Sequence, residues 1–266
     1  MILAISPKDI YATRRLVQEA AVLHVPLEIF SVQDLAKINF QVDVSKYNSL
    51  FIRQAFPWFE EVINLAKKFS ENGKKVIDGP EILSGFKTSK QLMYNALTTA
   101  GLPVPKNVEV GGGDLKYPFI LKWDYGFGGR HTYLIPNPEE FKKVYNLYPK
   151  QELITQEYIP ADYEFEVFTV GYLALPKVLK FKIQANGFKA DLKNYEIKNS
   201  SDLKSVVTLA ELAAKATGRE LAKVDILEKN GDLFVLEVNR SPSLIPFEQF
   251  TGYNVASEYV QYINNN

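Results

Sequence analysis

Residues 222–242, AKVDILEKNGDLFVLEVNRSP, form the stretch that decides the fold. Two apolar runs flank Asn230-Gly231, a strong short-range signal for a β-hairpin. Asp225 interrupts the first run. Glu237 and Asn239 interrupt the second at a spacing of two, so both side chains point to the same face of their strand. Buried carboxylates need a cation as partner, and carboxylate and amide oxygens suit Mg²⁺. The hairpin therefore predicts a metal site formed by these three residues.

The register of this hairpin decides whether the three side chains meet. A two-residue loop places Asp225 opposite Leu236 and turns its side chain away from Glu237. A three-residue loop, residues 229–231 with Gly231 left-handed in a bulge, places Asp225 opposite Val235 and on the metal face. The metal site requires this second register or another bulge of the same parity. The alternative is a hairpin whose acidic side chains are simply solvated.

Composition narrows the class of protein. The 266 residues are 46% apolar, enough for one large domain or two to three small ones. With 31 basic and 31 acidic residues the net charge is zero, which predicts neither nucleic acid nor an anionic membrane as partner. No cysteine is present, so disulfides and thiolate chemistry are excluded. The apolar N-terminal run is too short for a signal peptide, and no run matches a membrane span, so we expect a cytoplasmic protein.

The first eighty residues alternate between strand-like and helix-like segments. This alternation predicts an open parallel α/β unit. Arg53 directly follows the predicted strand 49–52, and ligands of such sheets gather at the carboxyl ends of strands. We therefore expect Arg53 to contact substrate, with an ordinary surface arginine as the alternative.

Two lysines and a glycine-rich loop predict contacts with phosphate. Lys90 lies in the first turn of a predicted helix, 88–100, where a cation opposes the helix dipole unless an anion is near. Lys122 lies inside the apolar strand 117–123. Three glycines follow: Gly126, Gly128 and Gly129. Because a glycine has no Cβ, backbone amides in such a loop can approach a phosphate closely. Their spacing matches neither a Walker loop nor a Rossmann fingerprint, which leaves a lid over a nucleotide or a plain turn.

The next segments offer contacts to the rest of a nucleotide. A strand that enters a Pro-broken linker predicts docking of adenine on exposed backbone groups: Gln156, Glu157, Tyr158 and Ile159. Glu164 and Glu166 alternate in the following strand and share one face, where one of the two carboxylates is expected to accept the ribose hydroxyls. The lysine-rich stretch beyond them is interpreted mainly as a solvated face, although Lys182 and Lys193 are candidates to meet phosphate.

Taken in chain order, these motifs resemble the ATP-grasp superfamily. The resemblance is to its carboxylate-amine ligases that add glutamate to ribosomal proteins or act in lysine biosynthesis. It is strongest at Lys90, at Leu121-Lys122 with the glycines, at 156–159, at 224–227, and at 236–239 with Ser241-Pro242. It implies an α/β fold of three parts: an N-terminal open parallel α/β domain (1–83), a small central lid (84–157) and a C-terminal antiparallel-sheet subdomain (158–266).

The resemblance also implies roles for individual residues. Lys90 and Lys122 would contact phosphates under the glycine loop, backbone at Glu157 and Ile159 would bind adenine, and Glu164 would hold the ribose. Asp225, Glu237 and Asn239 would bind Mg²⁺, with Mn²⁺ as the alternative ion. The substrate would depend on Arg53, Lys182 and Ser241, and the resembled enzymes are usually homo-oligomers.

Several residues depart from the resembled pattern. Relatives carry an arginine where Glu166 stands, and their basic, glycine-rich substrate segment is replaced by residues 188–194. They also commonly have a small residue at the position of Arg240. Because an arginine is a bidentate anion clamp, its loss removes charge from the site. We expect Arg240 and Lys193 to restore that charge near the reacting acyl phosphate, as catalytic groups.

The predicted function follows from these roles. We expect an ATP- and Mg²⁺-dependent ligase that phosphorylates a carboxylate and joins it to an amine, on an amino acid, peptide or small acidic metabolite. Positioning and charge neutralisation suffice for such phosphoryl transfer, so no nucleophilic cysteine or histidine is needed. The alternatives are a small-molecule kinase on the same scaffold and an ATP-binding protein without catalysis.

Overall fold

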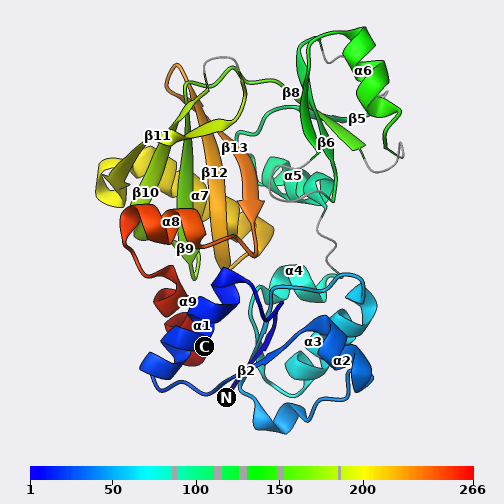
Figure 1. Ribbon diagram of the computed structural model, residues 1–266, viewed down its shortest axis with the longest axis vertical. Coiled ribbons are helices and arrows are strands. Elements are labelled where there is room, and N and C mark those ends of the chain that lie inside the picture. The colour runs from blue at the N-terminus through cyan, green and yellow to red at the C-terminus, as the bar shows by residue number, and fades with distance from the viewer. Residues whose placement is uncertain (86–88, 111–115, 126–130, 149–152, 185–186) are drawn as a thin grey trace.

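The computed structural model describes residues 1–85, 89–110, 116–125, 131–148, 153–184 and 187–266. Three β-sheets organise the chain (Figure 1). A parallel sheet belongs to the N-terminal part, a five-stranded sheet to the C-terminal part, and a four-stranded sheet stands apart at the top right of the view. The predicted α/β class, with one parallel sheet and antiparallel sheets beyond it, is confirmed.

The N-terminal sheet has the strand order β2-β1-β3-β4, with every described pair parallel. Its strands are β1 (Ile2–Ile5), β2 (Leu27–Phe30), β3 (Ser49–Ile52) and β4 (Lys75–Val76). The connecting helices are α1 (Tyr11–Val22), α2 (Val32–Lys37), a 3₁₀ turn (Val44–Lys46), α3 (Phe59–Glu71) and α4 (Gly79–Leu83). β1 and β3 are buried along their whole length, as expected for a sheet covered on both faces.

The C-terminal sheet has the order β11-β10-β9-β12-β13 and is antiparallel. Its strands are β9 (Tyr163–Val170), β10 (Leu173–Ile183), β11 (Ala190–Asn199), β12 (Leu221–Lys229) and β13 (Asp232–Asn239). A 3₁₀ turn (Ser200–Asp202) leads into α7 (Lys204–Thr217), whose alanines let it lie close on one face of the sheet. The opposite face carries the acidic side chains.

The third sheet lies in the segment predicted to form the lid, and we call it the lid sheet. Its order is β5-β8-β6-β7, from β5 (Asn107–Glu109), β6 (Phe119–Trp123), β7 (Thr132–Ile135) and β8 (Leu153–Glu157). Helix α6 (Pro138–Tyr145) starts after Asn137, whose side chain accepts a hydrogen bond from the Glu140 amide. α6 packs on one face through a small core that includes Phe119 and Val144. The other face carries Lys122 and Gln156.

The cores do not follow the predicted boundaries along the chain. Helix α5 (Lys90–Thr99), which the prediction places in the central lid, packs with α7 in the core of the C-terminal sheet. The last helices, α8 (Ile245–Thr251) and α9 (Val255–Asn265), pack against the N-terminal part, and α9 lies along α1. One hydrophobic core therefore joins the N-terminal and C-terminal parts, each of which also has a core of its own, and the lid sheet has a separate core.

The hairpin of β12 and β13 corrects one detail of the sequence analysis. Lys229 pairs with Asp232, so the turn is the two-residue Asn230-Gly231 with both residues at positive φ, and the three-residue loop is wrong. A bulge between Asp225 and the next residue then shifts the register. Asp225 lies directly opposite Glu237 as a result, so the parity required for a metal site is met by the bulge.

Candidate nucleotide and metal site

A row of carboxylates crosses three strands of the C-terminal sheet. Asp225 on β12 pairs with Glu166 on β9 and with Glu237 on β13. Directly paired residues share a face, so these three side chains lie side by side. Asn239 also lies on this face, and its amide Nδ2 donates to Asp225 Oδ2 at 2.8 Å. The residues predicted to bind metal are thus brought together.

Glu164 lies two residues before Glu166 on β9, so its side chain is on the same face of the sheet as the row. Oxygen atoms of Glu164, Glu166 and Asp225 all lie within 4.8 Å of one another, a spacing that fits one cation between them. Burial raises the pKa of Glu164 to about 7, and it also raises the pKa of Asp225 well above its usual range. Carboxylates held this close in a buried place favour protonation unless a cation arrives.

Lys90 lies at the start of α5, and Asp124, the residue after strand β6, is hydrogen-bonded to this end of the helix. The Ser89 hydroxyl caps the helix by accepting from the Leu92 amide, and it donates to Asp124 Oδ2 at 2.8 Å. The Lys90 ammonium then forms an ion pair with Glu237. Although burial acts to raise the pKa of Glu237, Lys90 and other cations outweigh it and lower that pKa. The anion expected beside Lys90 is therefore present.

Lys122 is a buried cation that faces the carboxylates. Only 7% of it is exposed, and its Nζ donates to the Tyr94 hydroxyl at 3.2 Å. Among the described residues no carboxylate lies within ion-pair distance of it. Burial lowers the pKa of Lys122 to about 8. Its ammonium is thus desolvated and available to an anion, which fits a phosphate group.

The predicted adenine segment lies where β8 ends. Glu157 donates its amide to the Lys106 carbonyl at 2.8 Å, and the Ile159 carbonyl accepts from the Ala161 amide. These bonds occupy the Glu157 amide and the Ile159 carbonyl, and adenine binding by this segment stays a prediction. Gln156 is 1% exposed, and its Nε2 has no hydrogen-bond partner among the described residues. That orphaned donor fits a ligand acceptor such as a ring nitrogen.

Arg53 and Ser241 come together at the carboxyl end of β3, although they are far apart in the chain. Arg53 Nη2 donates to the carbonyls of Ser241 at 3.5 Å and Pro242 at 3.0 Å. Its Nε and Nη1 are buried without a partner in the part of the chain that the structure describes, as is the Ser241 hydroxyl. Burial lowers the pKa of Arg53 to about 10, which still leaves it charged. This arrangement suits a carboxylate ligand.

The remaining predicted cations, Arg240, Lys193 and Lys182, do not form a cluster. Arg240 is buried beside Ile52, whose carbonyl accepts from its Nη1, and it lies 3.7 Å from Glu81. Lys193 is exposed on β11, at the opposite edge of the sheet from β13. These two side chains therefore do not form one charged group, and that expectation is corrected. Lys182 is exposed and pairs with Tyr163, so strand alternation turns it away from the Glu164 face.

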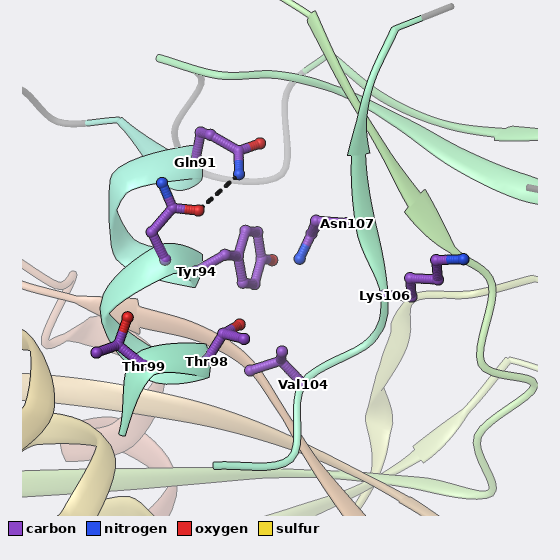
Figure 2. Close-up of a pocket in the computed structure, with 8 residues that line it drawn as sticks. Gln91, Tyr94, Thr98, Thr99, Val104, Lys106 and Asn107 are labelled. Carbon is purple, nitrogen blue, oxygen red and sulfur yellow. Dashed lines mark hydrogen bonds between the residues drawn. The ribbon is translucent and has the colours of Figure 1, made fainter. Parts of the chain in front are cut away.

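The glycines of the predicted lid loop, Gly126, Gly128 and Gly129, lie outside the described residues. A separate cavity of about 390 Å³ lies between α5 and β5 (Figure 2). Gln91 and Asn95 form one wall and are hydrogen-bonded to each other, while Tyr94 and Asn107 point toward one another across it. The Tyr94 hydroxyl reaches back to Lys122 and to the Leu236 carbonyl, so this ring separates the cavity from the carboxylate row.

Sequence reasoning missed two residues of this site. The sequence analysis gives Tyr94 no role, because its contact with Lys122 joins elements far apart in the chain. It also gives no role to Lys223, which lies two residues before Asp225 in an apolar strand. Its spacing to Asp225 was the available signal, because residues two apart in a strand share a face.

The lid sheet, the antiparallel sheet beneath it, and the lysines and carboxylates between them define a protein of the ATP-grasp fold. The model of the RimK-like ATP-grasp domain matches residues 104–263, and the chain belongs to that family.

Similar proteins agree with this assignment. A probable alpha-L-glutamate ligase of Haemophilus influenzae (strain Rd) is 28% identical over 187 residues, which is 64% of this chain and 60% of that protein. The chain thus spans about 60% of the length of the curated relatives it first matches. The ATP-grasp ligase PsnB, solved with a minimal precursor, has a TM-score of 0.72 at 15% identity and 98% coverage of both chains. D-cycloserine synthetase DcsG has a TM-score of 0.69 at 18% identity, covering 100% of this chain and 99% of its own.

Within the described residues, no helix has both the length and the apolar character that crossing a membrane requires.

Proposed function

We propose that this protein is an ATP- and Mg²⁺-dependent ligase that joins a carboxylate to an amine. The observation that carries the proposal is Lys122, a buried ammonium with no carboxylate partner among the described residues, which faces the row of Asp225 and Glu237. A desolvated cation opposite clustered carboxylates is the arrangement that a metal-bound polyphosphate would complete.

Lys90 and Glu237 would exchange partners when the nucleotide binds. In the structure they neutralise each other. A phosphate would take Lys90, and a divalent ion would take Glu237 with Asp225 and the amide oxygen of Asn239. When bound, Mg²⁺ neutralises charge on the transferring phosphate. The ion pair thus keeps both groups in place without leaving a buried charge unpaired.

Arg53 and Ser241 supply the recognition of substrate. Both present buried polar atoms without partners among the described residues, just beyond the metal-site residue Asn239. A substrate carboxylate would accept from the guanidinium and the hydroxyl together. We infer that the substrate is an amino acid or peptide, because similar proteins are named as a glutamate ligase and as a ligase with a precursor peptide.

The test is a coupled assay of ADP and phosphate release over a panel of amino acids and dipeptides, offered singly and in pairs, with Mg²⁺ or Mn²⁺. A ligase releases both products only when a carboxylate and an amine are present together. Glu237→Gln should lose at least about 100-fold in kcat, whereas Asp162→Asn, an exposed carboxylate paired with Lys229, should not.

Two outcomes would reject this function. A stable phosphorylated product without any requirement for an amine would assign a kinase. A clear thermal shift with ATP and Mg²⁺, but no turnover with any pair of substrates, would assign a nucleotide-binding protein.

A further inference from the structure

Lys223 lies inside the carboxylate row. Its Nζ is 2.7 Å from Glu166 Oε1 and 2.9 Å from Asp225 Oδ1. All three side chains are largely buried, with exposed fractions of 17%, 12% and 7% for Lys223, Glu166 and Asp225. Two carboxylates within ion-pair distance hold the ammonium in place from both sides. The lysine is therefore a fixed cation of the site.

Other lysines of the same strands form pairs of a different kind. Lys229, at the end of β12, pairs with Asp162, and their side chains are 32% and 44% exposed. Such an exposed pair contributes little and is easily exchanged with solvent. Lys223 instead bridges two buried carboxylates, Glu166 and Asp225. Asp225 is both a predicted metal ligand and a member of the group of three acids whose oxygens lie close together.

Each oxygen of Asp225 has a polar neighbour. Oδ1 lies 2.9 Å from Lys223 Nζ, an ion-pair contact without hydrogen-bond geometry, and Oδ2 accepts from the Asn239 amide. A divalent ion bound through Oδ1 would therefore lie next to an ammonium. Close approach of a divalent ion to that ammonium is strongly unfavourable at this separation and burial.

The charge count of the group gives the same result. If all groups are ionised, Glu164, Glu166 and Asp225 contribute three negative charges and Lys223 one positive charge, which leaves two negative charges. Lys122, which faces the row, lowers that remainder to one negative charge, and the ion pair of Lys90 with Glu237 adds none. Without Lys223 the same group would carry three negative charges and would attract free metal more strongly.

We propose that Lys223 is a resident cation that occupies part of the metal position in the nucleotide-free protein. It holds Asp225 until the metal arrives with the nucleotide, and it then remains on Glu166. This inference rests on the proposed function for the identity of the nucleotide. Its consequence is that metal binding is weak alone and strengthened by the nucleotide, so the two ligands bind cooperatively.

The experiment measures the affinity of the nucleotide-free protein for Mn²⁺ by electron paramagnetic resonance of the free ion, and for Mg²⁺ by calorimetry. Lys223→Met and Lys223→Gln both remove the charge, and the Gln variant keeps a polar side chain at this position. We expect both to bind Mn²⁺ at least about tenfold more tightly than the wild type, because one adjacent positive charge is gone. Lys223→Arg, which keeps the charge, should stay within about twofold of the wild type.

A matched control separates this effect from a general change in net charge. Lys229→Met removes one cation from the same strand but from an exposed pair, and it should leave Mn²⁺ affinity unchanged within about twofold. The gain in Mn²⁺ affinity caused by a non-hydrolysable ATP analogue should be smaller in Lys223→Met than in the wild type, by the same factor as the nucleotide-free affinity rises.

The inference is overturned if folded Lys223→Met and Lys223→Gln bind Mn²⁺ no more tightly than the wild type, or if Lys229→Met shows the same gain. It also fails if a structure with metal and nucleotide shows Lys223 still on Asp225. Each of these results can occur while the wild-type protein still releases ADP with a carboxylate and an amine. Failure of the inference is therefore distinguishable from failure of the proposed ligase function.

Discussion

Replacement of Lys122 by Met gives the sharpest test of the site. The lysine is 7% exposed, and its Nζ bonds to the Tyr94 hydroxyl. Met has a similar length and no charge, so it can fill the same space. Tyr94 keeps its other partner, the Leu236 carbonyl, in the variant. The substitution therefore removes a buried charge without leaving an obvious cavity or an orphaned hydroxyl.

The magnitude follows from the pKa. Burial lowers the pKa of Lys122 from its ordinary value of 10.5 to about 8. At about 1.4 kcal/mol per unit, the charged lysine costs about 3 kcal/mol of folding free energy at neutral pH. We expect Lys122→Met to unfold at higher urea concentration and to melt several degrees higher, since about 1 kcal/mol corresponds to 2–4 °C for a chain of this size.

The pH dependence has a defined sign. Below about pH 8 the folded lysine is charged and the full cost is present. From about pH 8 to 10.5 the folded lysine loses its proton while the unfolded one keeps it, so the wild type gains stability with rising pH. The advantage of Lys122→Met should shrink across this interval. Urea unfolding at pH 7, 8.5 and 10 measures it, with Lys106→Met as the control at an exposed lysine.

The same variant should lose nucleotide binding. Calorimetry with ATP and Mg²⁺ is expected to show affinity at least about tenfold weaker, because the phosphate loses its desolvated partner. A more stable protein that cannot bind its ligand is the usual compromise at functional sites. The reasoning is refuted if Lys122→Met is less stable at pH 7, or if it binds ATP as tightly as the wild type.

Three further substitutions test how the parts are held together. Gly218→Ala should lower the free energy of unfolding in urea by about 1–3 kcal/mol, because Gly218 has φ 68°. A Cβ there would also lie 3.1 Å from Pro80 Cβ and 3.3 Å from the Glu81 amide nitrogen. An unchanged urea midpoint would contradict this prediction. Arg240→Met should cost about 3 kcal/mol by leaving Glu81 and Asp78 less compensated, with kcat retained at low temperature; a loss of kcat at unchanged stability would instead make Arg240 catalytic. Ser89→Ala should cost about 1 kcal/mol and weaken ATP binding measured by calorimetry, since Ser89 caps the helix that starts at Lys90; unaltered binding would show that the cap does not position the lysine.

Some features of the fold could be predicted because they depend on local pattern. The alternation of strands and helices before residue 80 identified the parallel sheet. The acidic positions in β12 and β13 were recognised because charge inside apolar strands is unusual. The bulge opposite Asp225 could only be stated as a requirement, since a shift of one residue in register has no clear sequence signal.

The sequence by itself determined the α/β class, the hairpin and the residue types that a metal-bound nucleotide requires. Only the tertiary structure decided which charges meet: Lys223 with Glu166 and Asp225, Lys90 with Glu237, and Arg240 with Glu81, far from Lys193. It also placed α5 and the last helices with cores remote in the chain. The reason is physical, because side-chain identity and spacing fix local geometry, whereas the partner of a buried charge depends on strand order, register and burial that many distant contacts set together.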